Sequence, residues 1–540
     1  MYTGLFVGQP PPSIPVLNAW LDDHNVQRVD GVEIAPMASG SGLRLVATRD
    51  LDVGETICKI PKSALLSTRT SPLPMLSRPS STTTSHTILG LALALLHELR
   101  LGVDSDFWGY IQSLPREAVP IPTLWPLEDA GSDAQLAIPW LRGTEAERDL
   151  RRREREGVGL VHLRAFYDAA LPHLPPTRLH AEPSPFDAFA YAFSLVSTRA
   201  FVVDLYHMVA LCPFADILNH SANSHTSLAS DDFVCHKCGQ LSSCDHDVLG
   251  PNDLPARLEH VSPAEVERIE HEPDTVDMYV EWGVPAGREV MNSYGEKIGE
   301  ARLLVEWGFV PGSRPAPLDS EDEEDADNQD LEDDADEHFA GDGVTWDIDE
   351  VVDESLALEW IEREEGDPEA LLLFPLDAST PTTAEGFADD SALICAPSDR
   401  EGVYHLNYAG QVSLRIFGAL HLAETKRLGD TNSTLVSDIN HLEAAWEHIQ
   451  NSVDVPTLAP TLLATAKAMR ALIADRLDGM NRPKLSVGDL YDLREDLAPD
   501  ADLQAMALTI VINEVALLRS ALERWDDLLQ FAGDKDDDDE

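Results

Sequence analysis

Residues 212–220, CPFADILNH, end an apolar run with an aspartate and an Asn-His pair. A side-chain amide and an imidazole at such a position either bind a ligand or hydrogen-bond to nearby backbone groups, and in isolation the second interpretation is favoured. The meaning of this segment therefore depends on two others, one before it in the chain and one after it.

The earlier segment is GSGL at 40–43, and the later one is EVMNSYG at 289–295. Two glycines before a strand let the backbone approach a ligand closely, although they more often form only a tight turn. A tyrosine followed by a glycine at the end of a strand, as at Tyr294, is common. Each segment alone is weak evidence for a site.

The order and spacing of these segments form one pattern that is specific. It consists of Gly-x-Gly-Leu at 40–43, Arg-x-Phe at 199–201, Asp-x-x-Asn-His at 216–220, Gly-x-Glu-Val-x-x-x-Tyr-Gly at 287–295 and Leu-Leu-x-x-x-Gly-Phe at 303–309. This pattern resembles SET-domain methyltransferases, in the branch that includes plant Rubisco large-subunit methyltransferase and fungal ribosomal-protein and elongation-factor lysine methyltransferases. The phrases FWGYIQSLP at 107–115 and LRGT at 141–144 are also similar.

The resemblance implies an α+β protein, with a β-rich SET fold, a helical insertion and a following all-helical lobe like the branch's substrate-binding domain. The expected domains are a split SET catalytic domain at 15–315, an acidic disordered linker at 316–343, a helical C-terminal domain at 344–532 and an acidic tail at 533–540. Within the first domain we expect a helical insertion at about 67–185 and a Cys/His-containing insertion at about 222–275.

The resemblance also implies a reaction, which is methyl transfer from S-adenosylmethionine to the ε-amine of a lysine. Tyr294 is the expected catalytic residue, because a hydroxyl at that position orients the attacking amine, and it also borders the cofactor. The expected cofactor-binding residues are Gly40, Gly42, Leu43, Arg199, Asn219 and His220. Asn219 would hold the methionine moiety and His220 the adenine edge.

Three of the implied roles have a structural alternative. Arg199 follows Thr198, where the family has a serine, so it either contacts a ligand carboxylate or only braces the fold. Phe201 and Asp216 are expected to wall the channel of the substrate lysine, or else to serve in core packing and structural hydrogen bonding.

A second candidate site lies in the insertion after His220. Cys235, Cys238, Cys244 and His246 have the spacing C-x2-C-x5-C-x-H, which offers four soft or borderline ligands within one short loop. Such a set suits a tetrahedral structural zinc ion, since all four positions would be filled by the protein. The alternative is a group of free thiols on a flexible insertion.

Composition limits the kinds of partner. The formal net charge is −57, which argues against direct binding of nucleic acid or an anionic membrane and favours a basic protein substrate, such as a ribosomal protein, a translation factor or a histone. Six cysteines in 540 residues are too few for a disulfide scaffold, so we expect a reducing compartment, cytoplasmic and/or nuclear. The first twenty residues do not read as a secretory signal, and no uninterrupted apolar stretch reaches the roughly 20 residues of a membrane span.

Several elements follow from local patterns. Short strands are expected at 43–47, 56–60, 278–282 and 289–292, and an apolar core helix at 86–101. Further helices are expected at 186–206, 412–427, 460–477 and around 508–525, where apolar residues recur every three or four positions.

Two rival functions remain open at this stage. One member of the same branch methylates a histidine of actin, and neither Tyr294 nor Asn219 distinguishes a histidine acceptor from lysine. A non-enzymatic alternative is an acidic chaperone or binding module that keeps a SET fold. The identity of the substrate, the number of methyl groups added and the oligomeric state stay open.

Overall fold

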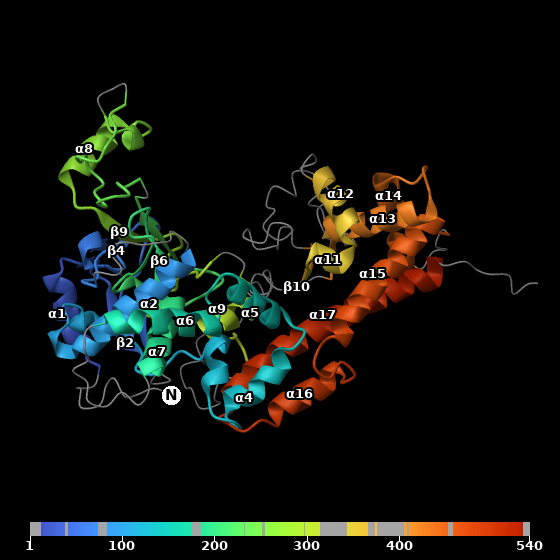
Figure 1. The fold of residues 1–540 in the computed structure, drawn as a ribbon, viewed down its shortest axis with the longest axis horizontal. Coiled ribbons are helices and arrows are strands. Elements are labelled where there is room, and N and C mark those ends of the chain that lie inside the picture. Colours follow the sequence, from blue (N-terminus) through green and yellow to red (C-terminus); the bar gives the residue numbers. More distant parts are fainter. Residues whose placement is uncertain are drawn as a thin grey trace, which may run out of the picture. The chain divides into compact units, whose positions relative to one another are not determined.

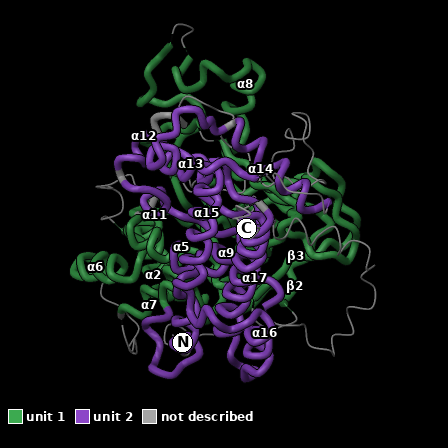
Figure 2. Tube along the Cα trace, turned by 90° about the vertical axis from the view of Figure 1, so that its right-hand side faces the viewer, with its two compact units in different colours: residues 1–124, 150–295, 306–308 green, residues 125–149, 296–305, 309–540 purple. Residues whose placement is uncertain are grey.

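The computed structural model describes most of the chain, namely residues 12–37, 42–73, 84–174, 185–231, 233–250, 254–295, 298–313, 343–364, 373–374, 404–407, 410–451 and 457–532. It contains two compact units (Figure 2). Unit 1 comprises residues 1–124, 150–295 and 306–308, and unit 2 comprises residues 125–149, 296–305 and 309–540. The acidic segment at 316–342 and the tail at 533–540 lie outside the described residues.

Unit 1 contains three small antiparallel sheets (Figure 1). Their strand orders are β1-β4-β9-β8, β2-β3 and β5-β7-β6. The strands are β1 (Gln27–Arg28), β2 (Val32–Pro36), β3 (Leu43–Ala47), β4 (Thr56–Pro61), β5 (Leu66–Ser67), β6 (Ala200–Val202), β7 (Val209–Leu211), β8 (Thr226–Ser230) and β9 (Thr275–Val280).

Side chains along β9 alternate between buried and half-buried. Val276, Met278 and Val280 are buried, while the residues between them are half-buried, as expected for a strand with one face toward a core. The strands predicted at 43–47 and 56–60 are confirmed as β3 and β4. The segment at 289–292 contributes isolated bridges, such as Val46 with Glu289, in place of a regular strand.

Helices make up the rest of the described regular structure of unit 1. Those within unit 1 are α1 (Ile14–Asp23), α2 (Thr84–Leu101), α3 (Trp108–Ile111), α6 (Leu160–Ala170), α7 (Pro185–Arg199) and α8 (Pro263–His271), while α5 (Glu145–Arg155) and α9 (Glu300–Trp307) run across the unit boundary. The apolar helix predicted at 86–101 is confirmed as α2, which packs against α7, and both helices contact the sheet of β5, β7 and β6.

Gly109 fixes the position of α3. A Cβ atom at this position would overlap the side chain of Trp20 on α1, so only glycine allows α1 and α3 to approach this closely. Trp20 also donates a hydrogen bond through Nε1 to the carbonyl oxygen of Asp106, at 2.7 Å. The FWGY phrase therefore serves close packing, and it places Tyr110 in the interior of unit 1.

The helix predicted at 186–206 is shorter than expected. It ends at Arg199, and residues 200–202 form β6, which pairs with β7. The sequence Ala-Phe-Val-Val that follows Arg199 favours a strand, and the backbone hydrogen bonds to β7 outweigh continuation of the helix.

Unit 2 is mainly helical but also contains strands. Its helices are α4 (Asp133–Ala137), α11 (Ile348–Val351), α12 (Glu354–Glu364), α13 (Leu414–Leu428), α14 (Leu435–Gln450), α15 (Pro460–Asp478), α16 (Val487–Glu495) and α17 (Asp502–Ala532). Its sheet has the order β10-β12-β13-β11, from β10 (Gly343–Trp346), β11 (Leu373–Phe374), β12 (Tyr404–Asn407) and β13 (Val412–Ser413). The predicted all-helical lobe therefore also contains a small sheet. Its strands were not predicted, because segments this short carry little periodic signal.

Amphipathic patterns produce the long helices of unit 2. The predicted apolar face of α17 is buried at Leu508, Val511, Ile512, Val515, Leu518 and Trp525, and it packs against α15. The segment predicted as a helix at 412–427 begins as β13. Ser413 then caps α13 by accepting a hydrogen bond from the backbone N–H of Ile416, and Gly429 ends the helix with a left-handed φ of 67°.

Two helical stretches are long and apolar enough to cross a membrane by length and composition alone, at residues 86–104 and 502–531. Of these windows, 67% and 61% respectively is buried within the described structure. Burial of this extent is typical of core helices.

Candidate active site

The segment that contains Asn219 and His220 lies beside the segment that leads to Tyr294. The backbone N–H of Asn292 donates to the carbonyl oxygen of Asn219 at 2.8 Å, and that of Ser221 donates to the carbonyl oxygen of Asn292 at 3.0 Å. These bonds form a parallel bridge between His220 and Asn292. The structure thus joins two motifs that are about 70 residues apart in the sequence.

Several contacts fix Tyr294. Its backbone N–H donates to Nδ1 of His220 at 3.1 Å, and the two rings lie with their centres 5.1 Å apart. Its ring also stacks on that of Trp307, at 5.4 Å. The hydroxyl donates to the carbonyl oxygen of Leu218 at 3.2 Å. The hydroxyl and a backbone carbonyl oxygen therefore lie together beside His220.

Asn219 links this region to the turn between β2 and β3. Its Nδ2 lies 2.7 Å from Oε1 of Glu289 and 3.9 Å from Sδ of Met37. Met37 in turn donates its backbone N–H to the carbonyl oxygen of Gly42, at 3.1 Å. Gly42 has a φ of +110°, which favours glycine. Asn219 therefore contacts Met37, and Met37 is hydrogen-bonded to Gly42.

Two of the predicted cofactor-binding residues need separate mention. Leu43 is half-buried and begins β3, next to Gly42. Gly40 lies outside the described residues, so its role stays a prediction from the sequence.

Arg199 and Asp216 form the inner part of the site. Asp216 lies in a buried 3₁₀ turn, η7 (Ala215–Ile217), which follows Phe214 with a φ of +82°. Its Oδ2 accepts a hydrogen bond from the Tyr110 hydroxyl at 2.6 Å, and its backbone carbonyl oxygen accepts one from Nη1 of Arg199, also at 2.6 Å. Left-handed backbone at a residue other than glycine costs of order 1–3 kcal/mol and is commonest at functional sites.

Burial governs the charges of this site. It raises the pKa of Asp216 to about 6, although the Arg199 guanidinium and the hydrogen bond from Tyr110 oppose the shift. Burial likewise raises the pKa of Tyr294, against the opposing charge of Arg199 and with the help of Asp216 and Glu289. The Tyr294 hydroxyl therefore stays protonated at neutral pH and can donate a hydrogen bond.

Two buried polar atoms of the site have no hydrogen-bond partner among the described residues. They are Nε of Arg199, a donor, and Oδ1 of Asp216, an acceptor. Buried polar atoms are nearly always satisfied in native proteins, so an unsatisfied donor and acceptor together suggest a ligand that supplies the missing partners.

The raised pKa of Asp216 predicts a pH-dependent stability. The pKa of Asp216 is about 6 in the folded protein, and its ordinary value is 3.8. Between pH 3.8 and about pH 6, Asp216 therefore keeps its proton in the folded protein and loses it in the unfolded protein. The stabilisation is complete below about pH 4 and is lost as pH rises toward 6, by on the order of 1–3 kcal/mol. Asp216→Asn, which cannot ionise and still accepts from Tyr110, should lack this component in denaturant unfolding measured from pH 4 to 7.

The matched control for that experiment is the exposed Asp23→Asn. It should retain the wild-type profile. If Asp216→Asn and wild type show parallel profiles over this range, Asp216 does not titrate there.

Phe201 lies on β6, two residues beyond Arg199. It is half-buried, and its backbone pairs with Ala210 of β7. A wall of a lysine channel and a packing residue of this small sheet both fit that position, so its role stays a prediction.

Three further residues belong to the site but were not assigned from the sequence. Met37 contacts Asn219, Tyr110 holds Asp216, and Glu289 accepts from Asn219. Tyr110 and Glu289 lie within phrases that we had recognised, so a signal was present at both positions. No sequence pattern pointed to Met37.

The four Cys and His residues of the insertion also come together. One potential ligand atom from each of Cys235, Cys238, Cys244 and His246 lies within 4.8 Å of every other. The group is thus able to hold a metal ion.

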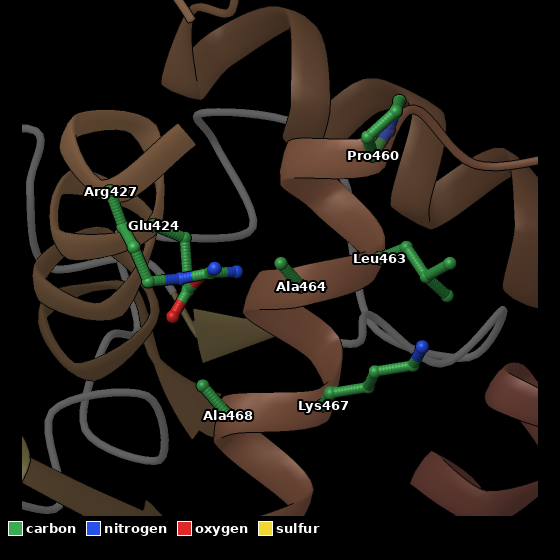
Figure 3. A pocket seen from close by; sticks show the side chains of 7 residues that line it. All are labelled: Glu424, Arg427, Pro460, Leu463, Ala464, Lys467 and Ala468. Carbon is green, nitrogen blue, oxygen red and sulfur yellow. The ribbon is translucent and has the colours of Figure 1, made fainter. Parts of the chain in front are cut away.

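A surface pocket lies elsewhere, between α13 and α15 of unit 2 (Figure 3). Glu424 and Arg427 line it from α13, and they pair with each other at 2.6 Å. Lys467 and four apolar residues of α15 complete its lining. None of the residues predicted for catalysis or cofactor binding is among them.

The fold of the chain is that of a SET-type methyltransferase. No family model matches the sequence. The solved structure of the SET domain of LSMT bound to lysine and AdoHcy aligns with a TM-score of 0.54 and 17% identity, over 96% of this chain and 94% of that one. Rubisco LSMT bound to AdoMet aligns with a TM-score of 0.53 and 17% identity, over 97% and 94%.

A curated relative extends this likeness to the sequence. Ribosomal lysine N-methyltransferase 3 of Saccharomyces cerevisiae is 26% identical over 330 residues, which cover 50% of this chain and 57% of that protein. The match thus spans little more than half of the relative's length. The predicted α+β class and the resemblance to the Rubisco large-subunit methyltransferase-like branch of SET proteins are confirmed.

Proposed function

We propose that this protein is a lysine N-methyltransferase, which transfers a methyl group from S-adenosylmethionine to a lysine side chain of a basic protein. The observation that carries the proposal is the junction of residues 218–221 with residues 291–294. This junction sets the Tyr294 hydroxyl against the carbonyl oxygen of Leu218 and Nδ1 of His220 against the Tyr294 backbone.

The residues of the site fit a methyl donor, S-adenosylmethionine, that carries charged groups of its own. S-adenosylmethionine brings a carboxylate, an ammonium and an adenine edge. Nε of Arg199 is an unpartnered buried donor among the described residues, and Oδ1 of Asp216 is an unpartnered buried acceptor. Asn219 and His220 add an amide and an imidazole beside the turn of Gly42, where the backbone is free to lie close to a ligand.

The bound donor supplies an electrophilic methyl group, whose bond to sulfur breaks as the new bond to nitrogen forms. The task of the protein is then mainly to position the amine. A lysine ammonium, with an ordinary pKa near 10.4, must first release its proton to solvent and lose its hydration water. The Tyr294 hydroxyl and the Leu218 carbonyl oxygen would orient the neutral amine, and Phe201 and Asp216 would border its approach.

The similar proteins support the same chemistry. One relative is named a lysine methyltransferase, and the structural neighbours hold lysine, AdoHcy or AdoMet. The formal net charge of −57 favours a basic substrate, such as a ribosomal protein, a translation factor or a histone. We place this activity in a reducing compartment, cytoplasmic and/or nuclear, because the described cysteines at 58, 212, 235, 238 and 244 form no disulfide.

Replacing Asn219 with alanine is expected to weaken binding of S-adenosylmethionine. Loss of one or two polar contacts costs on the order of 1–3 kcal/mol, which corresponds to roughly a 5- to 150-fold increase in Kd. Isothermal titration calorimetry measures this change directly. The unfolding temperature should change little, because Asn219 is only partly buried.

The exposed Asn432 of unit 2 provides the control, and Asn432→Ala should bind the donor as wild type does. If Asn219→Ala binds S-adenosylmethionine as tightly as wild type does, Asn219 does not contact the methyl donor. If wild-type protein does not bind the donor at all, the acidic binding module becomes the better account.

A further inference from the structure

The insertion between β8 and β9 has a different construction from the rest of unit 1. Residues 231–274 leave the sheet at the end of β8 and return at the start of β9. Among the described residues of the insertion, the buried apolar core consists of Val234, Leu241, Leu258 and Ile269, on which Tyr206, Phe233 and Val261 pack. A core this small rarely stabilises a segment of about 40 residues without a disulfide or a metal.

The first Cys-x-x-Cys pair sits on a tight turn. Gly239 follows Cys238 with a φ of +75°, and its backbone N–H donates to the carbonyl oxygen of Cys235 at 2.7 Å. Cys235 closes the turn by donating its own N–H to the carbonyl oxygen of Gln240, at 3.0 Å. A side chain at position 239 would clash with the ring of Tyr206. This turn presents both sulfur atoms toward one point.

A second turn presents the other two ligands. The backbone N–H of Cys244 donates to the Asp247 carboxylate at 2.8 Å, and that of Asp247 donates to the carbonyl oxygen of Cys244 at 3.0 Å. Between them, Sγ of Cys244 lies 3.9 Å from Nδ1 of His246.

Arg257 joins the two turns. Its guanidinium pairs with the Asp247 carboxylate at 2.8 Å and also donates to the carbonyl oxygens of Phe233, Leu241 and Ser242. The backbone on both sides of the cluster is therefore held by one half-buried cation. The result is a preorganised group of three sulfur atoms and one imidazole, all within 4.8 Å.

We propose that Cys235, Cys238, Cys244 and His246 bind one structural zinc ion that holds the insertion folded. Three thiolates and one imidazole are a common tetrahedral set for zinc, and four protein ligands leave no position for a substrate. This site is independent of the methyl-transfer site. Arg257 acts as its positioning residue, because it orders the two turns and contacts no ligand atom that an ion would need.

Lys62 fixes the other end of the insertion through an ion pair and a hydrogen bond. Nζ of Lys62 lies 2.9 Å from the carboxylate of Asp274 and donates to the carbonyl oxygen of Asp231 at 3.0 Å. Loss of zinc should therefore unfold the outer part of the insertion, while its junction with β8 and β9 persists.

Metal analysis of the full-length protein, purified in reducing buffer without chelator and dialysed, tests the site. We expect close to one equivalent of zinc in wild type. Cys238→Ser and His246→Ala should lose most of it. The neighbouring His236→Ala is the matched control and should retain it, because His236 is exposed and lies outside the cluster. Wild type that stays metal-free even after incubation with zinc chloride, or equal loss of zinc in His236→Ala and His246→Ala, would overturn the assignment.

Two further measurements separate a zinc site from its alternatives. Cobalt(II) added to the chelator-stripped protein should give the visible absorption of a tetrahedral thiolate site, and this band should be absent in Cys244→Ser. Limited proteolysis should cut within residues 231–274 after chelation and stop doing so when zinc is restored. An intramolecular disulfide among the three cysteines in protein isolated without reductant, or protease resistance that does not depend on metal, would contradict a structural zinc.

Discussion

Tyr294→Phe is expected to lower kcat by roughly 10²- to 10³-fold while the affinity for S-adenosylmethionine stays close to that of wild type. The magnitude is that commonly seen when one positioned hydrogen-bond donor is removed from an active site. The hydroxyl would orient the amine chiefly in the transition state, so its loss affects turnover more than binding. The measurements are steady-state kinetics and calorimetry with the donor.

The substitution preserves the aromatic contacts of the ring. Stacking on Trp307 at 5.4 Å and packing beside His220 both survive, so a purely structural role predicts little change in kcat. The exposed Tyr491 of unit 2 provides a control, and Tyr491→Phe should turn over as wild type does. A Tyr294→Phe variant with wild-type turnover would refute the catalytic role of Tyr294.

The second large effect is expected at Lys62. Its side chain is only 5% exposed and lies 3.0 Å from the buried carboxylate of Asp204 and 2.9 Å from that of Asp274. Lys62→Ala leaves two carboxylates without their shared cation, and breaking such a buried arrangement typically costs about 3–5 kcal/mol. Denaturant unfolding of the full-length protein, followed by tryptophan fluorescence, should show this loss.

A neighbouring lysine of the same strand region is the natural comparison. Lys59 pairs with Asp277 at 3.2 Å, but the two side chains are 42% and 30% exposed. Lys59→Ala should therefore cost less than about 1 kcal/mol. Similar losses for the two variants would show that burial of the Lys62 cluster does not stabilise the fold in the way described.

Strong local patterns predicted much of the fold. The strands β3 and β4 and the helices α2, α15 and α17 all carry clear periodicity or long apolar faces, and they lie where expected. The end of α7 at Arg199 was missed, because the choice between helix and strand there depends on pairing with β7, which is distant in the sequence. The strands β10 to β13 were missed for a different reason, because each is at most four residues long and carries little periodic signal.

The residues of the candidate site could be predicted where they lie within contiguous sequence motifs. Asn219, His220 and Tyr294 stand in such motifs, and the structure brings them together. Met37 and Tyr110 take part through side-chain contacts across the fold, at 182 and 106 residues of separation. No spacing rule reaches contacts of that kind, because they are set by how β2 and α3 pack.

The most direct test of the central claim is identification of the methylated residue. Full-length protein is incubated with S-adenosylmethionine carrying a labelled methyl group and with a lysate, and the labelled protein is digested and sequenced by mass spectrometry. We predict methyl groups on a lysine ε-amine of a basic protein, at a level that falls with Tyr294→Phe. Label on histidine alone, or no label transferred by protein that binds the donor, would contradict the account.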